Sequence, residues 1–256
     1  MLDFDGRVAA ITGAAKGIGR ALACELASRG CDVAVSDVDE SELQETGAMV
    51  RQRGAEVQTR VVDVSQRDAV EEWADDVVER FGAVHLVANN AGVSLTGTVE
   101  DLSYEDFEWL MSINFWGVVY GTKAFLPYIR RAGVGRVVNI SSAFGLIASA
   151  TQSAYNAAKF AVRGFTESLR VELALEAGEV GATCVHPGGI DTTIVRNSRI
   201  GDTGAMNREP EELIEEFEEQ IARTSPEEAA RTIVDGVERG EGRVLVGPDA
   251  RLVDVL

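Results

Sequence analysis

Residues that form metal sites and disulfide bonds are scarce in this chain. Its 256 residues include three cysteines, Cys24, Cys31 and Cys184, and two histidines, His85 and His186. The cysteines are odd in number, lack metal-ligand spacing and stand in apolar or small-residue surroundings, which indicates buried free thiols. The histidines are far apart in the sequence, and we expect structural roles for both. The composition therefore predicts no metal site.

Positive charge is also scarce, and arginine carries most of it. The chain has 24 Lys and Arg residues against 42 Asp and Glu residues, a net charge of −18. This charge repels a phosphate backbone or an anionic membrane surface, so we expect neither nucleic acid nor a membrane as a partner. Only three of the basic residues are lysines, at positions 16, 123 and 159. Lys159 therefore indicates a site that needs a compact ammonium group rather than general surface charge.

Linkers, internal repeats and low-complexity segments are absent from the sequence. A chain of this length, with 45% hydrophobic residues and only five prolines, can form one large domain, and we predict a single domain over residues 1–256. The first residues, MLDFDGRVAAITG, lack the basic and long apolar segments of a secretory signal. We therefore expect a cytoplasmic protein.

Short apolar runs alternate with amphipathic segments along most of the chain. The predicted strands are residues 8–12, 31–37, 55–63, 84–90, 135–141, 181–187 and 243–247, and the longest predicted helices are 104–131 and 153–177. Repeated strand–helix units with continuous apolar strands indicate an α/β, doubly wound parallel sheet of about seven strands with helices on both faces. Ligands bind such sheets beyond the carboxyl ends of the strands, so we expect the functional site there.

A glycine-rich turn, TGAAKGIG (12–19), follows the first predicted strand. Gly13, Gly17 and Gly19 allow the backbone to turn tightly and to approach a pyrophosphate, which then binds the N–H groups at the start of the next helix. Alone, the spacing G-x-x-x-G-x-G is weak support, because glycines also serve purely as turn formers. Asp37 ends the second strand about 20 residues after Gly17, where a carboxylate can accept hydrogen bonds from an adenosine ribose. Together these features predict a dinucleotide cofactor.

Asp37 and Lys16 favour different forms of that cofactor. A carboxylate a few ångströms from the 2′-phosphate of NADP would repel it by several kcal/mol, so Asp37 favours NAD. Lys16 precedes the second glycine and can reach a 2′-phosphate, but its flexible side chain can equally point to solvent. We predict NAD as the cofactor, with NADP as the less favoured alternative.

The stretch SAYNAAKFAV (153–162) has Tyr155 four positions before Lys159. In a helix the two side chains lie on the same face. A free phenol has a pKa of about 10, too high for ready proton exchange at neutral pH, and an ammonium group about 4–5 Å away can lower it by about 2–3 pH units. We therefore expect Tyr155 to exchange protons and Lys159 to lower its pKa. The alternative is a half-buried aromatic residue beside a solvated lysine.

Two polar residues extend this pair into a candidate site. Ser142 follows the strand predicted at 135–141, where its hydroxyl can hold a substrate oxygen next to the phenol. Asn114, in MSINFWGV (111–118), is a polar residue among apolar neighbours and can bind a water behind Lys159. Each also has a structural interpretation, Ser142 as a helix N-cap and Asn114 as a polar group at a helix bend.

These motifs resemble, in combination and in order, those of the short-chain dehydrogenase/reductase family in its compact single-domain form. The resemblance spans about residues 5–247 and rests on TGAAKGIG, NNAG (89–92), Asn114, Ser142, Tyr155-x-x-x-Lys159 and PGGIDT (187–192). It implies a Rossmann-like fold and reversible hydride transfer between C4 of a nicotinamide and a carbonyl carbon. The family commonly forms tetramers through its long central helices, which implies a homo-oligomer, a tetramer or a dimer.

The resemblance also assigns roles to individual residues. Tyr155 is the implied acid/base, Lys159 lowers its pKa and binds the ribose, Ser142 orients the substrate oxygen, and Asn114 holds a proton-relay water. Asp63 and Val64 are implied to contact the adenine, Asn90 the adenosine side, and Ile190 and Thr192 the nicotinamide carboxamide. The full implied set of cofactor contacts is Gly13, Lys16, Gly17, Ile18, Gly19, Asp37, Asp63, Val64, Asn90, Tyr155, Lys159, Pro187, Gly188, Ile190 and Thr192.

The segments expected to face the substrate, 93–98 and 143–152, are apolar or small and contain no Arg or Lys. We therefore expect a neutral, hydrophobic secondary alcohol or ketone of sterol, terpenoid or lipid-derived type. Residues 209–222 (EPEELIEEFEEQIA) predict an amphipathic helix. It is either part of a mobile substrate flap around 192–222 or a helix packed permanently on the body.

Three other functions share parts of this pattern. An NADPH-dependent 3-oxoacyl thioester reductase would use the same four residues, but Asp37 and the net charge of −18 argue against it. A regulator that senses NAD without turnover fits a broken Tyr/Lys pair better, and here the pair is whole. A sugar-nucleotide epimerase needs a different glycine spacing. We therefore predict an NAD-dependent oxidoreductase acting on CH–OH groups.

Overall fold

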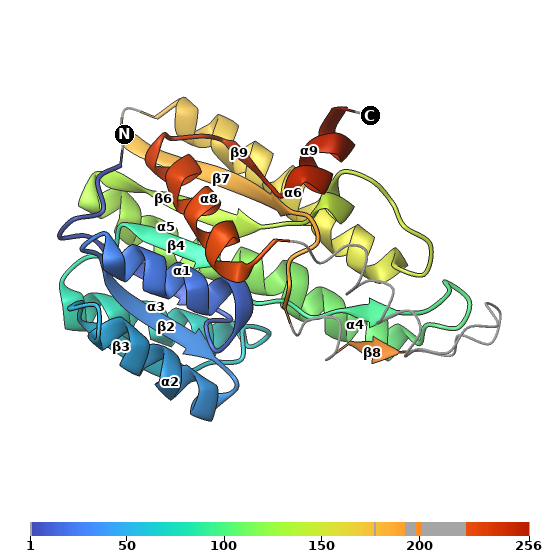
Figure 1. Cartoon of the computed structure of the whole chain (residues 1–256), viewed down its shortest axis with the longest axis horizontal. Coiled ribbons are helices and arrows are strands. Elements are labelled where there is room, and N and C mark those ends of the chain that lie inside the picture. Colours follow the sequence, from blue (N-terminus) through green and yellow to red (C-terminus); the bar gives the residue numbers. More distant parts are fainter. Residues whose placement is uncertain (1, 177, 193–197, 201–223, 256) are drawn as a thin grey trace.

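Seven parallel strands form the main sheet of the structure, a computed structural model that describes residues 2–176, 178–192, 198–200 and 224–255. In spatial order they are β3 (Val57–Val61), β2 (Asp32–Asp37), β1 (Val8–Thr12), β4 (Leu86–Asn89), β6 (Val134–Ile140), β7 (Glu179–Pro187) and β9 (Arg243–Val246). The strand order reverses between β1 and β4, which is the switch point where ligands bind in such sheets. The predicted doubly wound parallel sheet is confirmed (Figure 1).

Helices cover both faces of this sheet. One face carries α1 (Gly17–Ser28), α2 (Glu40–Arg51) and α8 (Pro226–Glu238), and the other carries α3 (Arg67–Phe81), α5 (Gly117–Ala132) and α6 (Ser153–Ala174) (Figure 1). Successive residues of β1 point to opposite faces, as the two-residue period of a strand requires. Ile11 packs in a core with Leu22 and Ile233, whereas Ala10 packs in a second core with Trp73 and Phe125. Both faces are therefore buried, which explains the continuous apolar strands of the sequence.

Short polar side chains fix where several helices begin. Asp39 accepts a hydrogen bond from the N–H of Glu42 at the start of α2, and Ser225 accepts one from the N–H of Glu228 at the start of α8. Ser103 does the same for α4 (Tyr104–Met111) through the N–H of Asp106. These caps satisfy N–H groups that a helix cannot satisfy itself.

The predicted helix 104–131 is wrong in one respect, because it is not continuous. It consists of α4, a π-helical segment η1 (Ser112–Trp116) and α5. A π-helical turn inserts an extra residue and redirects one side chain. The redirected region contains Asn114, which is fully buried. The structural interpretation of Asn114 as a polar group at a helix bend is therefore close to what the structure shows, although the break in the helix was not predicted.

Two further elements were not predicted. A small parallel sheet pairs β5 (Leu95–Thr96) with β8 (Arg199–Ile200), and α9 (Pro248–Val255) follows β9. Strands of two residues are too short for a hydrophobic period to be detected. The predicted flap around 192–222 falls mostly outside the described residues, and the predicted helix 209–222 falls entirely outside them.

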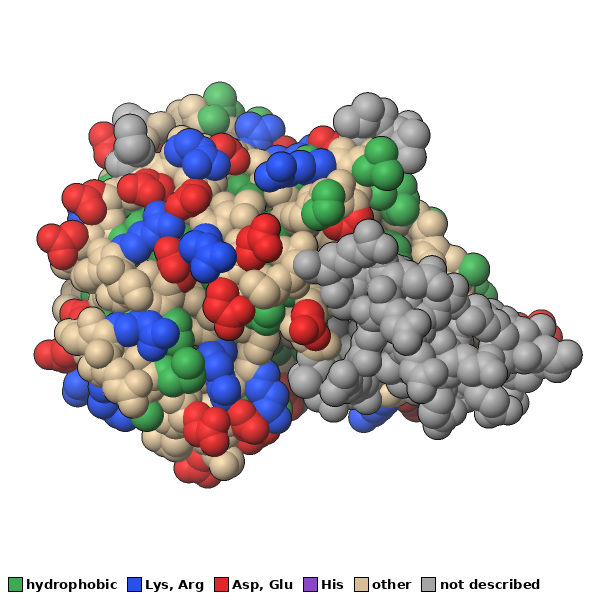
Figure 2. Space-filling view, in the orientation of Figure 1, with side chains coloured by type: hydrophobic (Ala, Val, Ile, Leu, Met, Phe, Trp, Pro, Cys, Tyr) green, Lys and Arg blue, Asp and Glu red, His purple; other side chains and the backbone are tan. Residues whose placement is uncertain are grey.

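Charged side chains of both signs are interspersed over the face formed by α1, α2 and α8 (Figure 2). Within the described part of the chain, no helix is long and apolar enough to cross a membrane. The same part contains no group of three His, Cys, Asp or Glu residues placed to hold a metal ion. All three cysteines are buried and free.

Candidate active site

The glycine-rich turn between β1 and α1 is packed tightly against the segment that follows β4. Gly13 has a φ of +66°, and a Cβ on it would lie 2.6 Å from the Cα of Ala91. A Cβ on Gly19 would collide with the carbonyl oxygen of Gly13. The side-chain amide of Asn90 donates to the carbonyl oxygens of Thr12 and Gly13, both at 3.0 Å. Asn90 therefore braces the turn itself.

The N-terminus of α1 is open to an anion. Lys16 is its N-cap residue, with no capping hydrogen bond from its side chain, and the first turn has no acidic residue. The N–H groups and the positive end of the helix dipole are therefore available to a pyrophosphate. A Cβ on Gly17 would lie 3.1 Å from the Cγ2 of Thr192, so the turn meets the PGGIDT segment. Ile18 is half-buried and packs against the apolar core.

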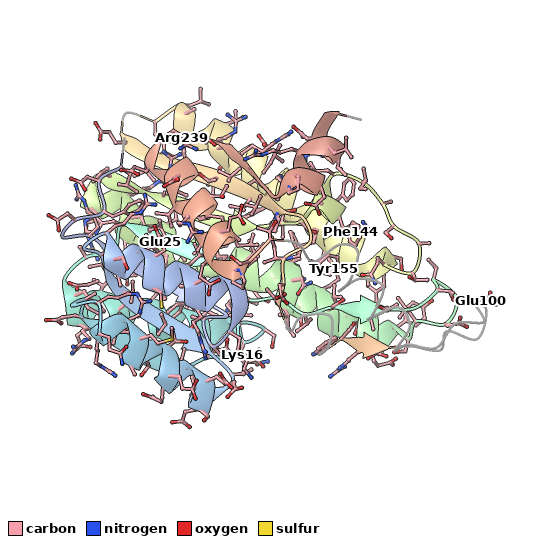
Figure 3. The ribbon with its side chains drawn as sticks, in the orientation of Figure 1. Lys16, Glu25, Glu100, Phe144, Tyr155 and Arg239 are labelled. Atoms are coloured by element: carbon pink, nitrogen blue, oxygen red, sulfur yellow. The ribbon has the colours of Figure 1, made fainter. Side chains whose placement is uncertain are left out.

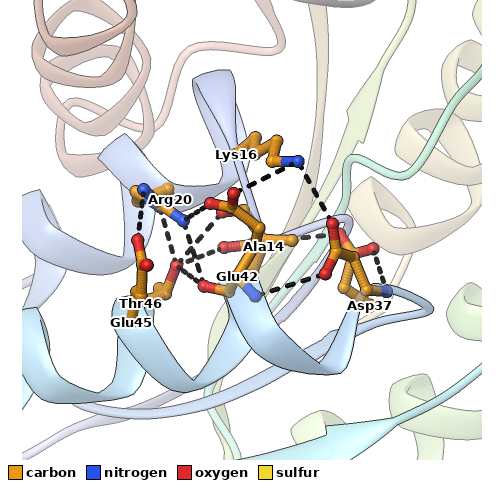
Figure 4. Close-up of polar contacts among 9 residues, drawn as sticks. Ala14, Lys16, Arg20, Asp37, Glu42, Glu45 and Thr46 are labelled. Atoms are coloured by element: carbon orange, nitrogen blue, oxygen red, sulfur yellow. Dashed lines mark hydrogen bonds and ion pairs between the residues drawn. The ribbon is translucent and has the colours of Figure 1, made fainter. Parts of the chain in front are cut away.

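Asp37 ties the end of β2 to the glycine-rich turn. Its carboxylate accepts hydrogen bonds from the N–H of Ala15 at 3.0 Å and from the N–H of Asp39 at 3.1 Å. Lys16 turns toward α2, where its ammonium pairs with Asp39 at 3.1 Å and Glu42 at 3.4 Å (Figure 4). The charge of Lys16 is thus offset by two carboxylates close to Asp37.

Asp63 and Val64 follow β3 and differ in their exposure. Asp63 is exposed, and its carboxylate accepts the N–H of Ser65 at 2.9 Å. Val64 is buried against α5, where a Cβ on Gly117 would lie 2.9 Å from its Cγ2. Any contact of Val64 with a ligand is therefore through its backbone.

Tyr155 and Lys159 lie in the first two turns of α6, as predicted. The Tyr155 ring packs edge-on against Phe144, with ring centroids 6.3 Å apart (Figure 3). The Lys159 ammonium lies 5.5 Å from the centroid of the Tyr155 ring and donates a hydrogen bond to the carbonyl oxygen of Ile140 at 3.0 Å. Lys159 is 3% exposed, so it is not the solvated lysine of the alternative interpretation.

The expected direction of the Tyr155 pKa is wrong for this arrangement. Burial raises the pKa of Tyr155, and the Ser142 side chain opposes this with a smaller effect. Burial also lowers the pKa of Lys159, from 10.5 to about 8. The expectation counted the attraction between phenolate and ammonium but omitted the cost of removing both groups from water.

Ser142 combines two roles that the sequence left as alternatives. Its hydroxyl accepts the N–H of Phe144 at 3.1 Å and caps η2 (Ala143–Gly145), a short 3₁₀ helix. The same side chain lies beside the Tyr155 phenol and affects its pKa. The capping interaction therefore holds Ser142 where a substrate oxygen could meet both hydroxyls.

His186 contacts this site, although the sequence predicted only a structural role for it. Its Nδ1 lies 3.0 Å from the carbonyl oxygen of Ser142, which requires a proton on Nδ1. Its Nε2 is buried and has no partner among the described residues. Burial lowers the pKa of His186 and keeps the ring neutral. The sequence signal for this contact was the position of His186 at a strand end, directly before Pro187 and Gly188.

Asn114 lies near Lys159 and is held firmly. Its amide donates to the carbonyl oxygen of Val93 and accepts the N–H of Val93, both at 2.8 Å. A Cβ on Gly92 would lie 3.4 Å from the Asn114 Oδ1 and 3.6 Å from the Lys159 Nζ. The structure thus brings these two predicted residues together, with the Asn114 amide engaged by the backbone of Val93.

The segment after β7 is braced by α9. The N–H of Gly189 donates to the Asp249 carboxylate at 2.6 Å, and a Cβ on Gly188 would collide with the same carboxylate. Ile190 is buried, and Thr192 meets Gly17. Asp249 is a residue that the sequence analysis missed, because α9 was not predicted.

Comparisons with known proteins agree with this arrangement. The family model for short chain dehydrogenases matches residues 7–202. A putative oxidoreductase, SadH, from Mycobacterium tuberculosis is 50% identical over 256 residues, which is 100% of this chain and 91% of that protein. A short-chain dehydrogenase/reductase from Burkholderia phymatum, solved in complex with NAD, has a TM-score of 0.91 and 32% identity over 100% of this chain and 94% of its own. Levodione reductase has a TM-score of 0.86 and 31% identity over 99% of this chain and 100% of its own.

Proposed function

The chain belongs to the short-chain dehydrogenase family, an oxidoreductase family, and we propose that it interconverts a secondary alcohol and a ketone with NAD. The observation that carries this proposal is the position of Ser142 beside the Tyr155 phenol, with the buried Lys159 ammonium 5.5 Å from the phenol ring. These groups lie at the carboxyl end of β6, at the same edge of the sheet as the glycine-rich turn.

The residues at this edge fit a nicotinamide dinucleotide. The open N-terminus of α1 suits the pyrophosphate, Asp37 suits the adenosine ribose, and Thr192 beside Gly17 suits the nicotinamide end. Bound there, the cofactor would supply hydride transfer at C4 of its nicotinamide. The proposed further contacts are Gly13, Lys16, Ile18, Gly19, Asp63, Val64, Asn90, Tyr155, Lys159, Pro187, Gly188 and Ile190.

Carboxylates near the expected ribose support NAD over NADP. Asp37, Asp39 and Glu42 lie around the end of β2 and the start of α2, and Lys16 is paired with two of them. A 2′-phosphate would meet net negative charge there, with repulsion of several kcal/mol per close pair at an effective dielectric near 20.

In the proposed mechanism the Tyr155 hydroxyl transfers a proton to or from the substrate oxygen. Ser142 donates a hydrogen bond to that oxygen and aligns it with the phenol. The Lys159 ammonium stabilises the phenolate that forms when Tyr155 gives up its proton. Asn114 fixes the Val93 backbone beside Gly92 and Lys159, and we propose that a relay water binds in this region.

The described walls near the phenol support a neutral, hydrophobic substrate. Phe144 packs on Tyr155, and Ile147 is 38% exposed. Arg199 lies opposite Leu95 of β5, but its guanidinium lies over the Trp109 ring at 3.6 Å and pairs with Asp106 at 3.1 Å. We propose a bulky apolar alcohol or ketone of sterol, terpenoid or lipid-derived type.

A panel of alcohols tests the substrate class. Oxidation of bulky apolar, small neutral and small anionic secondary alcohols is measured with NAD and with NADP. We expect turnover of the bulky apolar compounds with NAD. Turnover restricted to small anionic hydroxy acids, or a preference for NADP, would contradict the proposal.

We also propose a cytoplasmic homo-oligomer. Trp116 is 48% exposed and stacks on Tyr120 at 5.9 Å, and Phe160 is 41% exposed on α6. Exposed aromatic side chains on neighbouring helices suit an interface between copies. Light scattering of the wild type and Trp116→Ala tests this: a monomeric wild type would contradict it.

A further inference from the structure

A cleft of about 490 Å³ lies at the amino-terminal edge of the sheet, opposite the candidate active site. It is lined by the starts of β6 and β7, the end of α6 and the connection between α8 and β9. Arg239, the C-cap residue of α8, and Tyr155 lie toward opposite ends of the sheet in Figure 3. A ligand in this cleft would therefore touch none of the residues proposed above.

Arg136 of β6 is the central cation of this cleft, and glycines make room for it. A Cβ on Gly181 would lie 2.5 Å from its Nη1, and a Cβ on Gly240 would lie 3.2 Å from its Nη2. The guanidinium therefore lies close to the backbone at two glycines, where a larger residue would displace it. Its one hydrogen bond among the described residues is a long one, 3.5 Å from Nη1 to the carbonyl oxygen of Gly240.

The Arg136 guanidinium also has few hydrogen bonds and no counter-ion among the described residues. Its Nε is buried and has no hydrogen-bond partner among the described residues. Burial lowers the pKa of Arg136, and no carboxylate of the described chain lies within ion-pair distance of it. A half-buried cation without a counter-ion reduces stability. The chain has a net charge of −18, so the missing counter-ion does not reflect a shortage of carboxylates.

Three acidic side chains on the elements around the cleft are paired with other arginines or face solvent. Glu167 pairs with Arg170 at 2.9 Å, and Glu241 pairs with Arg239 at 2.7 Å. Glu179 lines the cleft but is exposed. The unpaired donors of Arg136 are therefore available to an anion that enters the cleft.

Four apolar side chains lie among the remaining cleft residues, which also include the charged Arg170 and Glu179. Leu2, Val134, Leu173 and Val180 line the cleft around Arg136. A volume of about 490 Å³ lies in the range of small-molecule sites, which combine apolar walls with a few placed polar groups. We propose that this cleft binds a small organic carboxylate, with its anionic group on Arg136 and a short apolar chain against these walls.

Calorimetric titration with octanoate tests the proposal, with 1-octanol as the neutral match and inorganic phosphate as the simple anion. We expect the wild type to bind octanoate at least about tenfold more tightly than either control. Arg136→Gln should weaken octanoate binding at least about tenfold, Arg136→Lys should restore part of it, and the exposed Arg51→Gln should have no effect.

A second variant keeps the test independent of Arg136 itself. Gly181→Ala retains every charge but displaces the guanidinium, and it should also weaken octanoate binding, with folding checked by circular dichroism. Absence of binding at millimolar octanoate, or equal affinity in the wild type and Arg136→Gln, would overturn the proposal. Phosphate binding as tight as that of octanoate would overturn the assignment to an organic carboxylate. NAD affinity should be the same with and without octanoate.

Discussion

The ammonium of Lys159 lies 5.5 Å from the centre of the Tyr155 ring and donates its hydrogen bond to the carbonyl oxygen of Ile140. Lys159 is buried and Tyr155 is half-buried, and burial lowers the pKa of Lys159 to about 8. The protein thus keeps a positive charge in its interior at neutral pH, beside a phenol whose pKa burial raises. Such an arrangement reduces stability, and it is expected to persist only where the charge serves a function.

Lys159→Met should therefore stabilise the fold and abolish activity. A folded pKa of about 8 against 10.5 in the unfolded chain corresponds to a net cost of about 3 kcal/mol. In the variant the carbonyl oxygen of Ile140 loses the hydrogen bond from Lys159, which costs about 1 kcal/mol. The folded pKa is lowered, so the full cost is present below pH 8 and disappears as the pH rises toward 10.5. Denaturant unfolding at neutral pH should show a gain of about 2 kcal/mol.

The matched control for this variant is Lys123→Met, since Lys123 is exposed on α5. It should change neither activity nor unfolding free energy by more than about 0.5 kcal/mol. A Lys159→Met protein that is less stable than the wild type would show that the ammonium is held favourably, contrary to this account.

Asp37→Asn should shift cofactor preference toward NADP. The substitution removes the charge that opposes a 2′-phosphate and keeps a side-chain oxygen for the N–H of Ala15 or Asp39. We expect the ratio of kcat/KM for NAD to that for NADP to fall by about 10–100-fold, measured by initial rates with both cofactors. Asp32→Asn is the control, because Asp32 lies at the opposite end of β2 and accepts the N–H of Glu56. An unchanged ratio in Asp37→Asn would contradict the assignment.

Glycine-to-alanine substitutions in two helices should have opposite effects. In Gly19→Ala the new methyl group collides with the carbonyl oxygen of Gly13, so we expect a loss of about 1–3 kcal/mol in stability and weaker NAD binding. In Gly164→Ala the methyl group meets nothing within 4 Å in the single chain. Gly164 lies one turn after Phe160 at the proposed interface between copies, so the expected gain of about 0.5–1 kcal/mol from helix propensity applies to the isolated chain. Thermal melts with and without NAD distinguish the two. Unaltered NAD affinity in Gly19→Ala would count against the proposed pyrophosphate site.

Stability should fall as the pH drops below about 6.5, the pKa of an unfolded histidine. Burial lowers the pKa of both His85 and His186, and the Nδ1 of His85 accepts the N–H of Val8 at 3.1 Å, so that nitrogen carries no proton. The unfolded chain therefore binds more protons in this range, and each histidine's contribution is full above the unfolded pKa and lost as the pH falls toward the folded one. Urea midpoints between about pH 7.5 and 5.5 should decrease in the wild type. An identical slope in the double variant His85→Gln, His186→Gln would exclude this cause.

The alternation of apolar strands and amphipathic helices was sufficient to predict the seven-stranded sheet, because strands buried on both faces carry a strong local signal. The candidate site could also be predicted from the sequence, since Ser142, Tyr155 and Lys159 lie at strand and helix ends that the pattern located. The contacts of His186 with Ser142 and of Asp249 with Gly189 could not be predicted from the sequence. Each joins residues brought together only by packing, and nothing local in the sequence encodes it. The sign of the Tyr155 pKa failed for the same reason, because desolvation is a property of the assembled fold.

The most direct test of the central claim is NADH formation by the wild type, Tyr155→Phe and Tyr104→Phe with the best secondary alcohol of the panel. Tyr104 is 86% exposed, so Tyr104→Phe is the control that removes a phenolic hydroxyl away from the site. We predict that Tyr155→Phe loses at least about 100-fold in kcat while still binding NAD, and that Tyr104→Phe keeps full activity. Equal turnover by wild type and Tyr155→Phe would contradict the assignment of the proton transfer to Tyr155, and with it the proposed mechanism.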